Sequence, residues 1–279
     1  MHNLEREPLS QKIVKTDQPL ITIITVVFNG MRYLEETIQS VIAQKSSNIE
    51  YIIIDGGSTD GTLDIIEKYQ DSIDCWVSEP DQGIYDAMNK GSKLANGLYL
   101  SFLNASDIYC QGAIKDIASS IAEENFDYCC GPVTIRNELN QDIRTVYPLK
   151  NFCYEQGKLM GMFAPHLSVF IKTEIFHTLN GFDLSFALSS DFDLLLRLSA
   201  KTKNAYYFDS PIGSFKLGGV SGSYKTYIDN FYIYKKHYVP ILPRLIYLTY
   251  FLIRVFIRKF MALQIFSSVI SKFKKIGKN

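Results

Sequence analysis

Short apolar runs alternate along the chain with segments in which apolar residues recur every three or four positions. The runs at 20–28, 49–55, 74–77 and 98–103 are almost continuous, which is typical of strands buried on both faces. The segments between them, at 33–45, 62–69 and 84–94, have the spacing of amphipathic helices, and Thr59 or Asp60 is placed to cap the second helix. The pattern predicts an α/β domain with a mostly parallel sheet and helices on both faces.

A polar or acidic side chain follows each of these strands. Asn29, Asp55, Asp81 (with Glu79) and Asp107 come from four separate strands. Ligands of open α/β sheets bind outside the carboxyl ends of the strands, so we expect these side chains to gather at one edge and form a site. Asp107 by itself fits either a helix cap or a metal ligand, because a buried carboxylate needs a partner or a cation.

The pattern is less regular after residue 110. It predicts a helix at 114–124, a strand that leads into a helix within 163–176, and a helix that begins near residue 190. We expect Ser190 to cap this last helix and Asp191 and Asp193 to lie in its first turn, where the helix dipole favours acidic residues. Asp193 is also spaced to pair with Arg197 one turn later.

The C-terminal region differs in charge from the rest of the chain. The 279 residues include 29 basic and 29 acidic ones, yet residues 240–279 contain eight basic residues and no acidic one. Arg244, Arg254, Arg258 and Lys272 fall on one side of a helical wheel, and apolar residues cover the remainder. We interpret this region as amphipathic helix on an anionic membrane surface, with a core-packed helix as the alternative. A nucleic-acid partner is disfavoured, because the aromatic residues lie in an apolar stripe.

The composition excludes several other classes of protein and site. The five cysteines and four histidines show no metal-ligand spacing, so reduced thiols in a cytoplasmic protein are expected. Residues 1–19 form a polar leader without the basic start and apolar core of a signal peptide. The glycine motifs of dinucleotide-binding proteins and P-loop NTPases are absent, as is the GxSxG motif of serine hydrolases. An acidic strand edge suits a sugar nucleotide instead, because this ligand donates hydrogen bonds and brings a divalent cation.

Five segments in order carry a family resemblance: ITIITVVFNG, IIIDGGSTDGT, SEPDQGIYDAMNKG, LYLSFLNASD and SSDFDLLLRL. They resemble the inverting glycosyltransferases of family 2, which have the GT-A fold, and especially bacterial enzymes of capsule, exopolysaccharide and O-antigen assembly. The resemblance implies a GT-A domain at 20–223, between the polar leader and a basic amphipathic helical region at 224–279.

The resemblance also implies a role for each matching residue. Asp191 would be the catalytic base, and His166 would lie on the acceptor side. Asp107 would bind Mg²⁺ or Mn²⁺ as the last acidic residue of a DxD element, although Ala105 and Ser106 replace its other members. The residues expected to contact the nucleotide sugar are Val26, Phe28, Asn29, Asp55, Asp86, Asn89, Ser106 and Asp107.

Several of these roles have structural alternatives that the sequence leaves open. Asp55 also fits an Asx-turn, Asp86 and Asn89 fit an exposed helix face, and Asp191 fits an ordinary helix start. Lys216 fits either a diphosphate partner or a solvated lysine. The glycines of 217–223 suit a segment that closes over the donor.

The function implied by the resemblance is transfer of a sugar, with inversion, from a nucleotide-sugar donor to a lipid-linked or oligosaccharide acceptor. UDP is the nucleotide expected in this family, and the enzyme would act in the cytoplasm, peripherally bound to the inner face of the plasma membrane. A nucleotide-sugar or glycan-binding module without catalysis is the first alternative, because the DxD element is incomplete. A sugar nucleotidyltransferase is the second, although the first strand lacks the glycine-rich basic loop it needs. The sequence indicates neither the sugar nor an oligomeric state.

Overall fold

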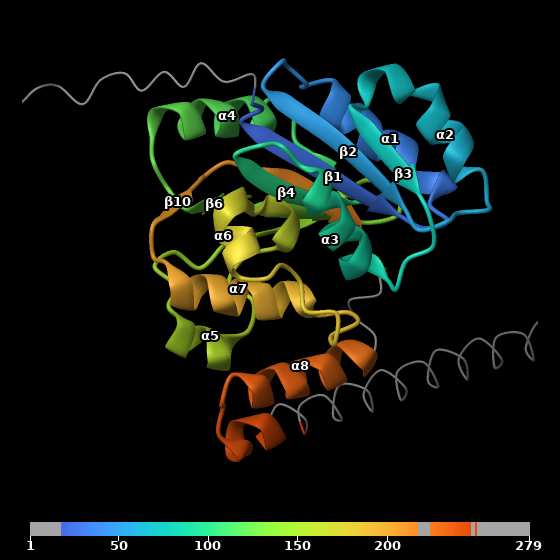
Figure 1. The fold of residues 1–279 in the computed structure, drawn as a ribbon. Coiled ribbons are helices and arrows are strands. Elements are labelled where there is room, and N and C mark those ends of the chain that lie inside the picture. Colours follow the sequence, from blue (N-terminus) through green and yellow to red (C-terminus); the bar gives the residue numbers. More distant parts are fainter. Residues whose placement is uncertain (1–17, 217–223, 247–248, 250–279) are drawn as a thin grey trace, which may run out of the picture.

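The computed structural model describes residues 18–216, 224–246 and 249 around a seven-stranded central sheet (Figure 1). Its strands, in spatial order, are β10 (Ala205–Tyr207), β6 (Tyr128–Cys130), β9 (Phe170–Lys172), β4 (Tyr99–Asn104), β1 (Ile21–Val27), β2 (Ile49–Asp55) and β3 (Cys75–Ser78). β1 pairs in parallel with β2 and β4, and β2 pairs in parallel with β3, whereas β9 runs antiparallel between β4 and β6. The sheet is thus mostly parallel, as the alternating pattern predicts.

Helices cover both faces of this sheet. Successive residues of a strand point to opposite faces, so Ile23 of β1 joins one apolar cluster and Ile24 joins the other. On the first face lie α1 (Met31–Ile42), α2 (Thr62–Lys68) and α4 (Ala113–Glu123). On the second face lie α3 (Ile84–Leu94), α6 (Thr173–Thr178) and α7 (Ser190–Lys201). The predicted two-sided arrangement is confirmed.

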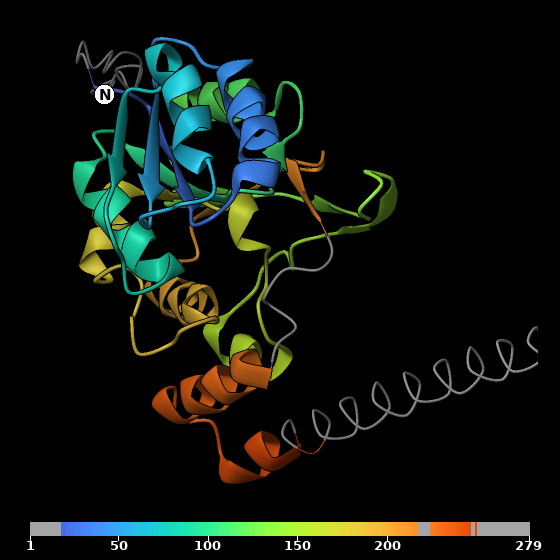
Figure 2. The ribbon, with the colours of Figure 1, turned by 90° about the vertical axis from the view of Figure 1, so that its right-hand side faces the viewer.

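A second, four-stranded sheet stands beside the first. It contains β5 (Ile108–Tyr109), β11 (Gly213–Lys216), β7 (Val133–Arg136) and β8 (Asp142–Val146), in that order. Figure 2 shows the β7–β8 hairpin extending away from the body of the molecule. Two short 3-10 helices, Gln70–Ser72 and His166–Ser168, and the helix α5 (Tyr154–Met160), which packs on α7, complete these elements.

Neither predicted helix cap is found. The N-cap of α2 is Gly61, so the prediction of Thr59 or Asp60 is wrong; Asp60 lies one residue earlier, and its Oδ1 accepts a hydrogen bond from the Thr62 backbone N–H at 3.0 Å in a turn that leads into the helix. The prediction for Ser190 is wrong: this residue already belongs to α7, and its buried hydroxyl has no hydrogen-bond partner among the described residues. The N-cap position is Ser189, and Asp191 lies in the first turn as predicted, where its carboxylate accepts the N–H of Phe192 at 2.9 Å.

The C-terminal region begins with α8 (Tyr224–Lys236), which packs against α7 and lies beyond it in both ribbon views (Figures 1 and 2). The Leu188 backbone N–H, just before α7, donates to Asp229 of α8 at 2.6 Å. Arg254, Arg258 and Lys272, three of the four residues of the predicted basic helix face, lie outside the described residues. Within the described part of the chain, no helix has the length and apolarity needed to cross a bilayer. The interface between α7 and α8 is apolar and consists of Phe186, Phe192, Leu196, Ile233, Tyr234 and Val239.

A buried carboxylate of α7 forms ion pairs and hydrogen bonds with residues at the end of α8. Asp193 is fully buried, and its Oδ1 lies 2.8 Å from both His237 Nε2 and Lys236 Nζ. Its Oδ2 accepts a hydrogen bond from Arg197 Nε at 2.7 Å, which confirms the predicted pair within α7. Burial opposes ionisation of Asp193, but the His237 hydrogen bond, the Arg197 charge and Lys236 outweigh it and lower the pKa to about 2.

Replacing Asp193 with Asn should therefore destabilise the fold by about 3 kcal/mol at neutral pH, because the cations around it lose their partner. The folded-state pKa is depressed to about 2, so the carboxylate's contribution is complete above its unfolded pKa near 4 and is lost as the pH falls between these values. Urea unfolding of wild type and variant should show a difference that shrinks over this interval. As a control, Asp209→Asn removes an exposed partner of Lys150 and should change little. A pH-independent difference for Asp193→Asn would contradict this account.

Candidate functional site

The carboxyl ends of β1, β2 and β4 lie side by side at one edge of the central sheet. Val27 of β1 is level with Asp55 of β2, and Val26 is level with Asn104 of β4. Asp107 follows three residues after Asn104. Parallel pairing thus brings the predicted strand-exit side chains to one edge, and this edge is where an α/β sheet offers a ligand site.

Asn29 ties the exits of β1 and β2 together. Its backbone is left-handed, with φ of 49°, its N–H donates to Ser58 Oγ at 2.7 Å, and its Oδ1 accepts from the Thr59 N–H at 3.0 Å. Of the two neighbours predicted to line the base pocket, Val26 is buried, whereas the Phe28 ring is 64% exposed. The Phe28 ring therefore offers an open aromatic surface at this edge, on which a nucleotide base can stack.

Asp55 is fully buried and engaged by its own loop. Its carboxylate accepts hydrogen bonds from the backbone N–H of Gly57 at 3.1 Å, the N–H of Ser58 at 2.9 Å, the Ser58 hydroxyl, and the Ser78 hydroxyl at 2.6 Å. These bonds build the Asx-turn that was the structural alternative. Direct contact of Asp55 with uracil or ribose stays a prediction, and it would require one of these bonds to be exchanged.

Asp107 is a buried carboxylate without a cationic partner among the described residues. Burial raises its pKa to about 7, against the opposing effects of the Ser106 hydroxyl and the Arg136 charge. The Ser106 Oγ donates to its Oδ1 over 3.3 Å, and the nearby Oδ1 of Asn104 is buried with no partner in the described structure. A buried carboxylate and an unpaired buried amide oxygen side by side call for a further partner, such as a cation or a water molecule.

These oxygens fit a hard divalent cation. Carboxylate and amide oxygens are the donors that Mg²⁺ and Mn²⁺ prefer, and Asp107 and Asn104 supply one of each. The described residues contain no group of three or more His, Cys, Asp or Glu side chains that would hold a metal alone. A cation here would take its other ligands from water and substrate oxygens, and metal binding by Asp107 stays a prediction.

An ion-pair cluster that contains the buried Arg136 lies near Asp107. The Glu36 carboxylate of α1 pairs with Arg136 of β7 at 3.1 Å and with Lys216 of β11 at 3.0 Å. The next residue, Thr37, donates its hydroxyl to the Asp107 carbonyl at 2.9 Å, which joins this cluster to the strand exit. Lys216 is thus a paired lysine rather than a solvated one. The segment 217–223 that follows it, predicted to close over the donor, lies outside the described residues.

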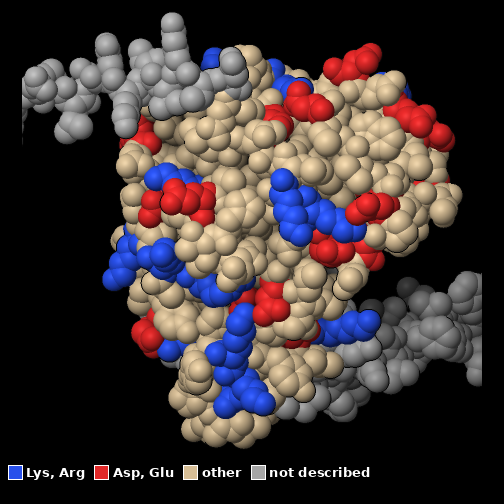
Figure 3. Space-filling model, viewed as in Figure 1, with Lys and Arg blue, Asp and Glu red and all other residues tan. Residues whose placement is uncertain are grey.

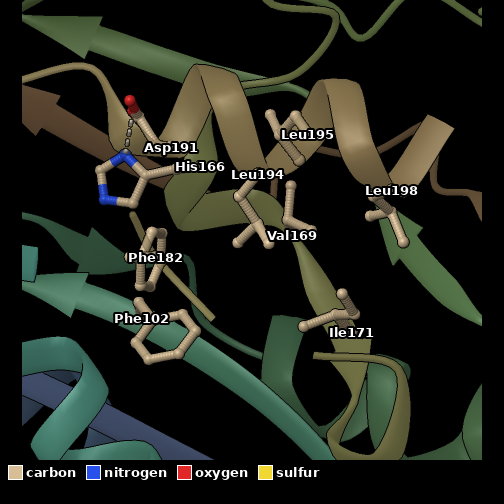
Figure 4. A pocket seen from close by; sticks show the side chains of 9 residues that line it. All are labelled: Phe102, His166, Val169, Ile171, Phe182, Asp191, Leu194, Leu195 and Leu198. Carbon is tan, nitrogen blue, oxygen red and sulfur yellow. Dashed lines mark ion pairs between the residues drawn. The ribbon is translucent and has the colours of Figure 1, made fainter. Parts of the chain in front are cut away.

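Asp191 and His166, the predicted base and the residue predicted to lie on the acceptor side, lie next to each other, as Figure 4 shows. His166 Nδ1 is 3.7 Å from Asp191 Oδ2, and His166 Nε2 is 3.3 Å from the Asn104 amide nitrogen. Burial lowers the pKa of His166, although the Asp191 charge opposes this shift, so the imidazole is neutral near pH 7. Asn104 and His166 thereby link the Asp107 region to Asp191.

The cavity beside this pair is too small for a sugar nucleotide. Its volume of about 20 Å³ has room for about one water molecule. Asp191 and His166 stand at one end of the cavity, as seen in Figure 4. The remaining lining is apolar: Phe102, Val169, Ile171, Phe182, Leu194, Leu195 and Leu198.

The two candidates on α3 differ in what they contact. Asp86 accepts the Gln82 N–H at 3.0 Å and lies 3.6 Å from Lys90, near the start of the helix. Asn89 is instead engaged by the backbone of Phe182, donating to its carbonyl and accepting from its N–H, both at 2.9 Å. Asn89 therefore joins α3 to the segment before α7, and its predicted contact with the donor is untested.

Two site residues received no role from the sequence. Asn104 lies in the strand exit that drew attention to Asp107, and Tyr85 lies in the segment GIYDAMNKG. The Tyr85 hydroxyl donates to Asp191 Oδ1 at 2.9 Å although 106 positions separate the two residues. A contact between residues so distant in sequence has no local pattern, so only the folded chain reveals it.

Comparisons with known proteins agree with this architecture. Among curated relatives, an uncharacterized glycosyltransferase of Mycobacterium tuberculosis is 31% identical over 190 residues, which cover 65% of this chain and 70% of that protein. A PGL/p-HBAD biosynthesis glycosyltransferase of the same species is 28% identical over 217 residues, which cover 74% of this chain and 80% of that protein.

Solved structures of Staphylococcus aureus TarS share the fold. Full TarS superposes with a TM-score of 0.61 at 16% identity, over 76% of this chain but only 38% of TarS. The TarS fragment 1–349 in complex with UDP gives a TM-score of 0.61 at 16% identity, over 83% of this chain and 70% of the fragment. The predicted GT-A fold is confirmed. The model of glycosyl transferase family 2 matches residues 22–176, more than half of the sequence, and the chain belongs to this family.

Proposed function

We propose that this glycosyltransferase moves a sugar from a UDP-sugar to an acceptor hydroxyl with inversion at the anomeric carbon. The observation that carries the proposal is the linked series Asp107, Asn104, His166 and Asp191, which connects the predicted diphosphate and base positions at one sheet edge. TarS, with which this chain shares its fold, has been crystallised with UDP and with UDP-GlcNAc, which supports a UDP-sugar as donor.

In this mechanism Asp191 is the general base. Its Oδ2 takes the proton of the acceptor hydroxyl while the acceptor oxygen attacks the anomeric carbon from the face opposite the diphosphate. The bond to the diphosphate breaks with its electron pair, so the configuration inverts in one displacement. General-base assistance of this kind typically contributes about 10²- to 10⁴-fold to the rate.

The leaving diphosphate gathers negative charge as this bond breaks. Asp107 and the Asn104 amide oxygen would hold Mg²⁺ or Mn²⁺, which when bound supplies charge neutralisation at the diphosphate. Lys216 and Arg136, paired with Glu36 beside Asp107, add fixed positive charge close to the same position.

The acceptor in this proposal is a lipid-linked sugar of bacterial surface polysaccharide biosynthesis, at the inner face of the plasma membrane. Figure 3 shows Lys and Arg side chains gathered over the part of the surface formed by α7 and α8. An amphipathic basic surface of this kind binds anionic lipid headgroups. Large apolar side chains also stand exposed from α8 onward: Ile228, Tyr232, Tyr238, Ile241, Leu242, Leu245 and Ile246.

The Asp191→Asn variant tests the assignment of the base. It should lower turnover by about 10²- to 10⁴-fold and leave donor affinity nearly unchanged, because Asn keeps the shape of Asp but cannot take a proton. Calorimetry gives the affinity for UDP-GlcNAc, and release of UDP in the presence of Mn²⁺ gives the rate. Asp116→Asn is the matched control, because Asp116 also lies in a helix first turn but is exposed on α4. Full activity of Asp191→Asn would reject the assignment.

The Asp107→Asn variant tests the metal position. Donor binding should lose its dependence on Mn²⁺ and weaken by about 10-fold or more, because a neutral amide is a poorer cation ligand than a carboxylate. Titration of UDP with and without Mn²⁺ separates the metal-dependent part of the affinity. An unchanged Mn²⁺ dependence would place the cation elsewhere or remove it from the proposal.

Removal of residues 240–279 tests the membrane surface. The cut keeps α8 and the buried Val239 contact with α7, so thermal stability and UDP affinity should stay close to those of the full chain. Binding to vesicles that contain anionic phospholipid should weaken strongly, because the cut removes eight basic residues and the apolar stripe, while the basic side chains of α7 and α8 remain. Unchanged co-sedimentation of the shortened chain with such vesicles would contradict this assignment.

A further inference from the structure

The two carboxylate oxygens of Asp191 have different surroundings. Oδ1 accepts two hydrogen bonds, from the Tyr85 hydroxyl and from the Phe192 backbone N–H, both at 2.9 Å. The nearest group recorded for Oδ2 is His166 Nδ1 at 3.7 Å, which is longer than a hydrogen bond. Within the described part of the chain, Oδ2 is therefore the oxygen that keeps its lone pairs for a proton.

The packing of the Tyr85 ring fixes its hydroxyl at Asp191 Oδ1. It is 7% exposed, and its ring packs on Phe182 with 5.1 Å between the ring centroids. Asn89, one turn later on α3, fixes the backbone of Phe182 with two hydrogen bonds of 2.9 Å. Burial, together with the Asp191 charge, raises the pKa of Tyr85 well above its ordinary value. The hydroxyl therefore stays protonated and donates a hydrogen bond to the carboxylate.

The same helix also reaches the donor side of the site. α3 begins directly after the Asp81 loop, and the Asp81 carboxylate lies so close to Gly56 that a Cβ there would come within 2.5 Å of its Oδ2. Gly56 follows Asp55 at the exit of β2. One short helix thus connects the strand edge, where the donor is expected, to the carboxylate that meets the acceptor.

We propose that Tyr85 is a positioning residue for the Asp191 base: its hydroxyl occupies Oδ1 and so presents Oδ2 to the acceptor hydroxyl. This inference rests on the proposed function. The acceptor proton passes to Oδ2, the acceptor oxygen bonds to the anomeric carbon, and the diphosphate leaves with the electron pair. Tyr85 gains and loses no proton in the step, and it sets the direction from which the carboxylate approaches.

The Tyr85→Phe variant isolates the hydroxyl, because it keeps the ring that packs on Phe182. Release of UDP from UDP-GlcNAc with Mn²⁺ should show kcat lowered by about 10- to 100-fold, the scale of a hydrogen bond to a charged group, with KM for the donor unchanged. Adding Tyr85→Phe to Asp191→Asn should produce no further loss, because Tyr85 acts through that carboxylate.

Tyr99→Phe is the matched control. Tyr99 is also buried, and its hydroxyl donates to the Phe126 carbonyl at the opposite end of β4 from the site. This variant should lose stability and keep its kcat. A double-mutant cycle on urea unfolding should show coupling between Tyr85 and Asp191 and none between Tyr99 and Asp191.

A wild-type kcat for Tyr85→Phe would overturn the inference, as would an equal loss of kcat in the Asp191→Asn background or the absence of coupling in unfolding. Full activity of Asp191→Asn has a different meaning, because it would reject the base itself and with it the proposed function.

Discussion

The parallel pairing of β1 with β2 and β4 is the constraint on which the site depends. Parallel strands end at the same edge of a sheet. Asp55 and Asn104, with the residues just beyond them, therefore come together although β2 and β4 each pair with β1 and not with each other. The second face of the same sheet then receives α3 and α7, which bring Tyr85 and Asp191 to that edge. A shift of this register by one residue would reverse the facing of every strand side chain and disperse the site.

Two buried aspartates show how the surroundings of a carboxylate separate a structural role from a functional one. Asp193 is surrounded by Arg197, Lys236 and His237, which outweigh its burial and lower its pKa to about 2. Asp107 has no such partner in the described structure, and burial raises its pKa to about 7. The first arrangement stabilises the contact between α7 and α8. At Asp107 no buried ion pair in the described structure offsets the free-energy cost of burying a charged group. Uncompensated burial of this kind is characteristic of ligand sites.

α7 connects these two regions. Its first turn holds Asp191 toward the sheet edge, while Asp193, two residues later, faces α8. The first part of the basic C-terminal region therefore supports the helix that carries the predicted base. The helix that carries the predicted base and the start of the C-terminal region thus form one packed unit.

The sequence by itself determined the strand–helix alternation, the strand exits at residues 29, 55 and 107, and the Asp193–Arg197 pair, because strand alternation, helical periodicity and i,i+4 spacing are local. The tertiary structure decided what each polar group contacts. Asp55 is enclosed by its own turn, and Asn89 binds the backbone of Phe182. Tyr85 meets Asp191 across 106 positions, and Asn104 meets His166 across 62. These contacts join separate elements, and no periodicity within one element can reveal which group from another will lie beside it.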